Sequence, residues 1–306
     1  MIDAKHGKWM LEYFTPHEAH LHGIKDFIVS IQTPFQAVDI VETYDYGRAL
    51  LLDSKMQSAE ADEFIYHELL IHPALICHPA PKSAFVVGGG EGAALREIYR
   101  YPTIEKLYMV DIDEQVVRLC EKHLPEWNAG AFTDSRTILK FQDARAFLEN
   151  TKEKFDLIVI DITEPMEGGP SYLLFTKEFY QLVNGRLTDD GLISLQAAST
   201  SPIWIECHAC IIKTLREVFP VVRSYQGVIP SFDAVWGFGL GSKKYDPAAL
   251  SAQEVDQRLV ARGITQLKHF EGPIHSALFA LPRYMRDSYD RLGRVIEDQK
   301  PIFLSI

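Results

Sequence analysis

A carboxylate lies inside a glycine-rich loop of this chain, where its charge would attract or repel any ligand bound there. The apolar run 84–87 leads into Gly88-Gly89-Gly90-Glu91-Gly92, and a helical pattern follows at 93–100. An apolar strand, a glycine loop and a helix are typical of the opening of a nucleotide-binding βαβ unit. Glu91 would repel a phosphate, and it would equally repel the carboxylate of an amino-acid-bearing nucleoside. The loop therefore favours a cationic ligand.

Further acidic residues follow the predicted strands. Asp111 ends the strand predicted at 106–111, Asp143 follows the one at 137–141, and Asp161 and Glu164 follow the one at 157–161. Ligands of open α/β sheets bind outside the carboxyl ends of the strands, so we expect these side chains and Glu91 to ring one crevice. Asp111 has the spacing of a residue that accepts hydrogen bonds from ribose hydroxyls, and Asp143 is placed to receive an adenine amino group.

Two other uses of these carboxylates remain open. A single acidic residue after a strand often caps the next helix, and clustered carboxylates also suit a hard cation. We prefer a nucleoside site without a metal, because the glycine loop and the ribose position already account for two members of the set. Asp161 and Glu164 also precede Pro165 and Gly168-Gly169-Pro170, which exclude a helix before about residue 176 and leave those carboxylates free to face a ligand.

The pattern of apolar residues predicts an α/β fold with two domains. Short β-like runs at 27–31, 37–42 and 48–52 predict a small N-terminal β-hairpin domain over residues 1–60. From residue 61 to 306, helical stretches alternate with strands predicted at 84–87, 106–111, 137–141, 157–161, 192–196, 221–225 and 234–240. This alternation predicts a Rossmann-like, mostly parallel seven-stranded sheet.

Composition limits the possible partners and the compartment. The 306 residues are 47% hydrophobic, and their net charge of -11 argues against sequence-independent binding of nucleic acid, which needs a basic surface. No apolar run approaches about 18 residues, so no membrane span is expected. Four cysteines, and a first segment unlike a secretory leader, predict a reducing compartment and a cytoplasmic location.

Several motifs in order resemble those of the aminopropyltransferases, the spermidine synthase family, over nearly the whole chain. They are Tyr66-His67-Glu68, Gly88-Gly89-Gly90-Glu91-Gly92, Asp111-Ile112-Asp113-Glu114, Asp143-Ala144 and Asp161-Ile162-Thr163-Glu164-Pro165. Other runs look more like thermospermine synthases than ordinary spermidine synthases: Lys55-Met56-Gln57-Ser58-Ala59-Glu60, Asp62-Glu63-Phe64-Ile65-Tyr66-His67-Glu68, Ile71-His72-Pro73-Ala74-Leu75, Glu167-Gly168-Gly169-Pro170 and Pro230-Ser231-Phe232 with Trp236-Gly237.

The resemblance implies a methyltransferase-type sheet, a homodimer, and transfer of an aminopropyl group from decarboxylated S-adenosylmethionine to a polyamine, without a prosthetic group. It implies spermidine as the acceptor and thermospermine as the product, with spermidine or spermine synthesis from putrescine, agmatine or spermidine as the alternative. Asp161 would be the catalytic base, assisted by Tyr66. The co-substrate would contact Gln36, Gln57, Gly88, Gly90, Glu91, Asp111, Asp143, Ala144, Asp161 and Pro170. The acceptor would contact Tyr66, His67, Glu91, Asp161, Glu164, Gln196, Phe232 and Trp236.

One residue of the predicted acceptor site differs from the family pattern. The family usually has Asp where this chain has Glu164, whose side chain reaches roughly 1.5 Å further, one carbon-carbon bond. That reach affects which nitrogen of a long amine sits at the reactive centre. Two other functions stay open: an S-adenosylmethionine-dependent methyltransferase would share the sheet, and a non-catalytic polyamine-binding protein would share the acidic crevice. Cys207-His208-Ala209-Cys210 has ligand-like spacing, but we interpret it as part of a helical core.

Overall fold

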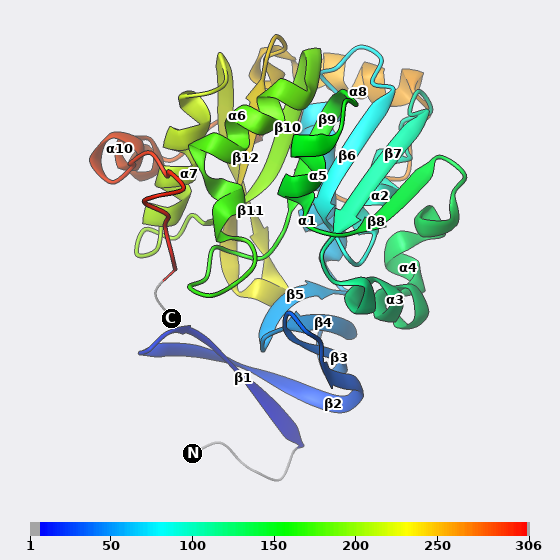
Figure 1. Cartoon of the computed structure of the whole chain (residues 1–306), viewed down its shortest axis with the longest axis vertical. Coiled ribbons are helices and arrows are strands. Elements are labelled where there is room, and N and C mark those ends of the chain that lie inside the picture. Colours follow the sequence, from blue (N-terminus) through cyan, green and yellow to red (C-terminus); the bar gives the residue numbers. More distant parts are fainter. Residues whose placement is uncertain (1–6, 305–306) are drawn as a thin grey trace.

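The N-terminal part is a five-stranded antiparallel sheet. This computed structural model describes residues 7–304. The strands pair in chain order (Figure 1): β1 (Lys8–Thr15), β2 (Glu18–Gln32), β3 (Ala37–Thr43), β4 (Arg48–Leu52) and β5 (Lys55–Ala59). The three predicted runs lie in β2, β3 and β4, whereas β1 and β5 were not predicted. β5 contains no β-branched residue, so its conformation depends on pairing with β4 rather than on local propensity.

A second sheet contains all seven predicted strands, most of them longer than predicted. They are β6 (Ser83–Gly88), β7 (Lys106–Asp111), β8 (Thr137–Phe141), β9 (Phe155–Asp161), β10 (Leu187–Ser199), β11 (Val221–Ile229) and β12 (Ala234–Ser242). Their order is β11-β12-β10-β9-β6-β7-β8. β12 is antiparallel to both neighbours and the other pairs are parallel. The predicted Rossmann-like α/β fold is confirmed.

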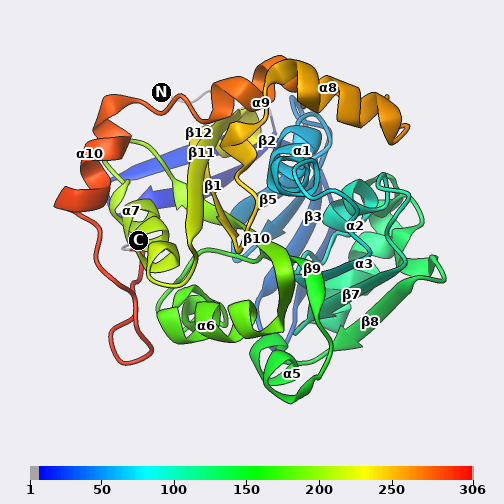
Figure 2. The same cartoon turned by 90° about the horizontal axis from the view of Figure 1, so that it is seen from above.

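Helices cover both faces of the second sheet (Figure 2). Their bounds are α1 (Glu63–Leu75), α2 (Ala93–Ile98), α3 (Glu114–His123), α4 (Pro125–Asn128), α5 (Ala144–Asn150), α6 (Lys177–Arg186), α7 (Glu206–Arg216), α8 (Ala252–Ala261), α9 (Gly272–Leu278) and α10 (Arg283–Arg291). Side chains alternate along each strand, so Val86 joins the core under α1, α2 and α8, while Phe85 and Val87 join the core under α5, α6 and α7. Within residues 7–304, no helix has the length and apolarity needed to cross a bilayer.

The two sheets meet at the edge where the strands of the second sheet end. Val38, Ile40 and Leu50 of the first sheet share a buried cluster with α3 and with Trp127 of α4. The Trp127 Nε1–H donates a hydrogen bond of 2.6 Å to Ser58 Oγ on β5. The five-stranded sheet therefore covers the carboxyl ends of the second sheet (Figure 1), and this is where the predicted site residues lie.

Candidate active site

A cavity of about 1060 Å³, including its open mouth, lies between the two sheets. Residues of β4 and β5, with Gln36 just before β3, form one wall, and the ends of β6, β7, β9 and β10 form the other. The lining contains every predicted site residue except His67: Gln36, Gln57, Tyr66, Gly88, Gly90, Glu91, Asp111, Asp143, Ala144, Asp161, Glu164, Pro170, Gln196, Phe232 and Trp236.

The glycine loop is held against the end of β9. Gly88 has a φ of 75°, and a Cβ added there would lie 2.3 Å from the carbonyl oxygen of Asp161. The next residue, Gly89, donates a backbone hydrogen bond of 2.8 Å to that same carbonyl. Glycine is required at position 88 both for the left-handed conformation and for the close approach. This contact fixes Asp161 beside the loop that carries Glu91.

Asp161 and Tyr66 form a pair inside the cavity. The Tyr66 hydroxyl donates a hydrogen bond of 2.8 Å to Asp161 Oδ1, whereas Asp161 Oδ2 is buried and has no hydrogen-bond partner among residues 7–304. Burial and the charge of Glu91 raise the pKa of Asp161 to about 6, although His67 and the Tyr66 hydrogen bond act in the opposite direction. Burial and the neighbouring carboxylates raise the pKa of Tyr66, so the phenol stays protonated. The free oxygen is oriented to accept a proton or to bind a cation.

His67 is the one predicted acceptor residue that is absent from the lining of the cavity, and its contact with the acceptor stays a prediction. The imidazole is fully buried behind Glu91, with Nε2 3.2 Å from Glu91 Oε1 and Nδ1 2.9 Å from Glu63 Oε2. Burial alone would lower its pKa, but the two carboxylates outweigh burial and raise the pKa to about 10. Consecutive helical residues point about 100° apart, so His67 cannot share the direction of Tyr66. A protonated His67 instead holds Glu91 from behind.

Asp111 and Asp143 combine the two uses that the sequence left open. Asp111 Oδ1 accepts a hydrogen bond of 2.8 Å from the Asp113 backbone N–H, while Oδ2 faces the glycine loop at Gly90. Asp143 Oδ1 accepts a hydrogen bond of 2.8 Å from the Ala146 N–H and so caps α5. Burial and the charges of nearby carboxylates raise the pKa of Asp111 to about 7. Each carboxylate keeps one oxygen for a ligand in the cavity.

The predicted acceptor half of the cavity combines aromatic rings with fixed polar groups. Phe232 lies edge-on to Trp236 with ring centres 5.1 Å apart, and it lies 6.0 Å from the Tyr66 ring. Gln196 donates a hydrogen bond of 2.9 Å to the Ile162 carbonyl and accepts one of 2.9 Å from the Ala198 N–H. Both ends of its amide are thereby engaged, so Gln196 braces the segment after Asp161 as well as lining the cavity.

Comparison with known proteins identifies the family of this chain. Residues 63–251 match the spermine/spermidine synthase domain, and residues 8–60 match the spermidine synthase tetramerisation domain. The chain belongs to the spermine/spermidine synthase family.

Relatives in this family share almost the full length of the chain. A polyamine aminopropyltransferase of Saccharolobus solfataricus is 40% identical over 297 residues, covering 97% of this chain and 98% of the relative. One of Sulfolobus acidocaldarius is 40% identical over 294 residues, covering 96% and 97%. The predicted membership of the polyamine aminopropyltransferases is therefore confirmed, and thermospermine formation remains a prediction.

Solved spermidine synthases have the same fold. A spermidine synthase in complex with the transition-state analogue AdoDATO aligns with a TM-score of 0.86 at 30% identity, covering 93% of this chain and 95% of the other. The spermidine synthase of Thermotoga maritima aligns with a TM-score of 0.84 at 30% identity, covering 93% and 94%.

The sequence analysis did not predict the apolar part of the cavity lining. Side chains from both sheets form a wall beside the glycine loop: Leu50, Leu52, Met56, Val87, Val110, Ile112, Val116 and Leu174. Such a wall suits the face of a nucleobase. In the sequence these residues look like ordinary core positions of strands and helices. The position of Ile112, directly after Asp111, was the one available signal.

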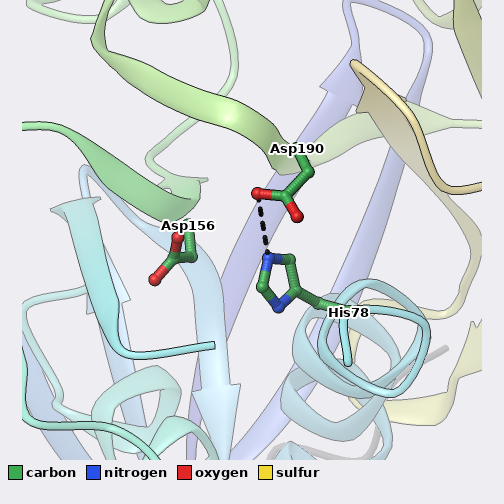
Figure 3. Close-up of side chains that lie close together, drawn as sticks. All are labelled: His78, Asp156 and Asp190. Carbon is green, nitrogen blue, oxygen red and sulfur yellow. Dashed lines mark ion pairs between the residues drawn. The ribbon is translucent and has the colours of Figure 1, made fainter. Parts of the chain in front are cut away.

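A separate cluster of a histidine and two carboxylates lies outside the cavity (Figure 3). Ligand atoms of His78, Asp156 and Asp190 lie within 4.8 Å of one another. However, the Ala80 backbone N–H donates to His78 Nδ1, so the proton of the neutral ring is on Nε2, which leaves no lone pair there for a metal. Asp156 Oδ2 already accepts a hydrogen bond of 3.0 Å from the Ser83 N–H. We assign the cluster to hydrogen bonding at the start of the strands.

The segment Cys207-His208-Ala209-Cys210 lies in α7 and packs in the core under the second sheet. Both cysteines are free and buried. His208 Nδ1 hydrogen-bonds the Ala197 carbonyl at 2.8 Å, and Nε2 lies 2.8 Å from Ser224 Oγ. Both ring nitrogens are therefore engaged within the protein, as the core interpretation requires.

Proposed function

We propose that this protein transfers the aminopropyl group of decarboxylated S-adenosylmethionine to a polyamine and releases 5′-methylthioadenosine. Membership of the family supports the reaction, and a solved relative binds AdoDATO, named as a transition-state analogue. The observation that carries the proposal is the buried Oδ2 of Asp161, which has no hydrogen-bond partner within residues 7–304, in a cavity that Glu91 also lines. These carboxylates attract a sulfonium and ammonium groups, and they disfavour the carboxylate that intact S-adenosylmethionine carries.

The residues of the cavity divide between the two substrates. The co-substrate lies along the glycine loop, with its ribose on Asp111, its adenine beside Asp143 and Ala144, and its aminopropyl ammonium between Glu91 and Asp161. Gln36, Gln57 and Pro170 complete this half of the cavity. The acceptor lies across Tyr66 and Glu164, between the rings of Phe232 and Trp236 and beside Gln196. His67 acts on the site through Glu91, whose carboxylate it holds by a hydrogen bond.

The chemical step is a displacement at carbon. The lone pair of an amine nitrogen attacks the aminopropyl carbon beside the sulfonium, the carbon–sulfur bond breaks, and its electron pair leaves with 5′-methylthioadenosine. Primary amines of this kind are almost fully protonated at neutral pH, so the site must bind the cation and take up one proton. Asp161 is the base, and the Tyr66 hydroxyl orients it through Oδ1. The remaining carboxylates align nitrogen, carbon and sulfur.

We propose spermidine as the acceptor and thermospermine as the product. The support is the likeness of the runs that begin at Lys55, Ile71, Glu167 and Pro230 to thermospermine synthases. Attack by the aminopropyl end of spermidine gives thermospermine, and attack by the aminobutyl end gives spermine. The longer side chain of Glu164 bears on this choice, because it lines the acceptor half of the cavity.

One assay tests both parts of the proposal. The protein is incubated with decarboxylated S-adenosylmethionine and, separately, putrescine, agmatine, cadaverine, norspermidine or spermidine, and the products are resolved by mass and chromatography. We expect methylthioadenosine release to be fastest with spermidine and the product to co-elute with thermospermine. A spermine product would reassign the attacking nitrogen. Tighter calorimetric binding of intact S-adenosylmethionine than of its decarboxylated form would favour a methyltransferase, and polyamine binding without methylthioadenosine release would favour a binding protein.

We also propose that the chain forms a homo-oligomer through its N-terminal sheet, with a homodimer as the smallest assembly. Residues 8–60 match a domain described by tetramerisation, and β1 exposes the apolar side chains of Trp9, Leu11 and Tyr13 along one side. β1 is also the edge strand of its sheet, and such edges commonly pair with another chain.

A further inference from the structure

Asp62 is a buried carboxylate at the junction of the two domains. It lies between β5 and α1, and only 4% of its surface is exposed. An aspartate directly before a helix usually caps that helix, but the side chain of Asp62 makes no capping hydrogen bond to α1. Its Oδ2 instead accepts a hydrogen bond of 2.6 Å from the Ser231 backbone N–H, and its Oδ1 accepts one of 2.8 Å from the Ser231 hydroxyl. Both oxygens therefore bind one residue far along the chain.

Ser231 belongs to the tight turn that carries Phe232 into the cavity. One turn of 3-10 helix, η4 (Pro230–Phe232), joins β11 to β12. The next residue, Asp233, has a left-handed φ of 48°, and its backbone N–H donates a hydrogen bond of 3.0 Å to the Pro230 carbonyl. The side chain of Phe232 lines the cavity. Because the turn is closed by its own hydrogen bond, a shift of Ser231 moves the Phe232 ring with it.

The N-terminal sheet holds the same turn at two further points. The Tyr46 hydroxyl, from the connection between β3 and β4, donates a hydrogen bond of 3.1 Å to the Pro230 carbonyl. On β2, His20 Nε2 lies 3.2 Å from Asp233 Oδ2, and the Asp233 side chain is 75% exposed. Ser231 is only 1% exposed, so water cannot readily replace a lost partner there. The bond to Asp62 is therefore the contact that fixes the turn most firmly.

We propose that Asp62 is a positioning residue for the acceptor, because through Ser231 it sets the place of the Phe232 ring in the cavity wall. This inference rests on the proposed aminopropyl transfer. The Phe232 ring lies between those of Tyr66 and Trp236, where the acceptor is proposed to bind. Aromatic faces attract ammonium groups only at close range, and a displacement of about 1 Å in a substrate-positioning group can lower the rate substantially.

Two substitutions weaken the link to Ser231. Asparagine has one acceptor oxygen, so Asp62→Asn leaves one donor of Ser231 without a partner, whereas Ser231→Ala removes only the hydroxyl and keeps the charge of Asp62. The acceptor is the amine, among those in the assay above, that the wild type uses fastest. We expect its KM to rise roughly tenfold in Asp62→Asn and roughly threefold in Ser231→Ala. The calorimetric dissociation constant of methylthioadenosine should stay within about twofold of the wild type, because the turn lies outside the co-substrate half.

A double-mutant cycle separates positioning from direct charge attraction. Phe232→Ala removes the ring that Asp62 is proposed to position. Adding Asp62→Asn to Phe232→Ala should therefore change the acceptor KM by no more than about twofold. If the charge of Asp62 attracted the amine directly, the same addition would raise the KM roughly tenfold again.

Asp156→Asn is the matched control. Asp156 Oδ2 also accepts from both donors of one serine, the Ser83 backbone N–H at 3.0 Å and the Ser83 hydroxyl at 3.2 Å. This pair lies where β6 and β9 begin, at the ends of the strands opposite to the cavity. We expect the acceptor KM of Asp156→Asn to stay within about twofold of the wild type, even where its melting temperature falls as far as that of Asp62→Asn.

The outcomes distinguish this inference from the proposed function. A folded Asp62→Asn variant with an unchanged acceptor KM overturns the inference, as does a rise that persists in Phe232→Ala or an equal loss of methylthioadenosine binding; aminopropyl transfer then still stands. If Asp62→Asn does not fold, Ser231→Ala decides, and an unchanged KM there overturns the inference. A wild type that releases no methylthioadenosine with any of the amines overturns the proposed function and this inference with it. A raised KM that disappears in Phe232→Ala supports the inference.

Discussion

In the proposed reaction, Asp161 has to be an anion when the acceptor loses its proton, yet its surroundings favour the protonated form. Only 9% of its surface is exposed, and Glu91 adds a second negative charge nearby. Binding of the cationic substrates reverses this balance, because a sulfonium and an ammonium stabilise the carboxylate. The site therefore stabilises the ionised form of Asp161 when cationic substrates are bound and destabilises that carboxylate in the empty protein.

We expect Asp161→Asn to fold normally and to bind the co-substrate, but to lose turnover by a factor of about 10² to 10⁴, the usual contribution of a positioned base. The melting temperature should be equal to or above that of the wild type at pH 8, because a buried charge is removed. Single-turnover release of methylthioadenosine measures the loss, and calorimetry measures co-substrate binding. An Asn variant with near-normal turnover would remove Asp161 from the role of base.

The pH profile should report the same group. Because the pKa of Asp161 in the free protein is about 6, we expect kcat/KM for the co-substrate to fall tenfold per pH unit below about pH 6 and to level off above it. The sign follows from the need for the ionised carboxylate. In the variant Asp161→Asn this acid limb should disappear. Initial rates from pH 4.5 to 8.5 check the profile, and an acid limb that persists unchanged in the variant would assign it to another group.

At the scale of elements, the loop between β6 and α2 owes its shape to a contact with β9. Gly88→Ala would place a methyl group against the Asp161 carbonyl in a left-handed conformation, so we expect loss of co-substrate binding and a destabilisation of several kcal/mol. Gly130→Ala is the matched control, because Gly130 also has a positive φ, 83°, but no atom lies within 4 Å of the added carbon. It should cost about 1 kcal/mol. Urea unfolding and calorimetry measure both; equal effects would disprove the close-contact argument.

The α1–α2 pair depends on a buried ion cluster behind the site. Glu97 is fully buried and accepts from Arg96 and Arg100, and it lies 3.0 Å from His72 Nε2. Although burial raises the pKa of Glu97, these partners hold it well below its usual value. The contribution of Glu97 to stability is therefore present above about pH 4 and is lost as the pH falls toward the folded-state pKa.

Glu97→Gln should therefore destabilise the protein by about 3–5 kcal/mol at pH 7, because Arg100 and the buried His72 lose their carboxylate partner and Arg96 keeps only Glu63. The difference from the wild type should shrink as the pH falls below 4. Glu114→Gln, which breaks an exposed pair with Arg118, should change stability by less than about 0.5 kcal/mol. Denaturant unfolding at several pH values measures the two variants, and equal effects would contradict the burial argument.

The sequence predicted the elements whose local pattern agrees with their environment. The seven strands of the second sheet are apolar runs, and the acidic residues that follow β7, β8 and β9 reach the cavity as the topology requires. β1 and β5 lack such a pattern, so the strands themselves were not predicted, although the resemblance already placed Gln57 of β5 at the site. His67 lies behind Glu91 rather than in the cavity lining because a motif in a helix distributes its residues around the axis.

At the scale of the whole molecule, a chain with a net charge of -11 still exposes an apolar strip on β1 and β2. Leu11 has 42% of its surface exposed in the middle of β1, beside Trp9 and Tyr13. Patches of this kind on an edge strand mark interfaces, and here the strip lies on the side of the sheet opposite to Glu12.

Leu11→Glu should dissociate the proposed oligomer. Burying an unpaired carboxylate in an apolar interface has a desolvation cost that the contacts of one side chain do not offset. Light scattering should then give a mass near 34.8 kDa, the mass of one chain, where the wild type gives at least twice that value. Val260→Glu is the control: Val260 on α8 is 71% exposed outside the strip, so its variant should keep the mass of the wild type. A wild type that is already monomeric, or a Leu11→Glu variant with unchanged mass, would show that this strip is not the interface. If Leu11→Glu dissociates but keeps its aminopropyltransferase rate, one protomer holds a complete site.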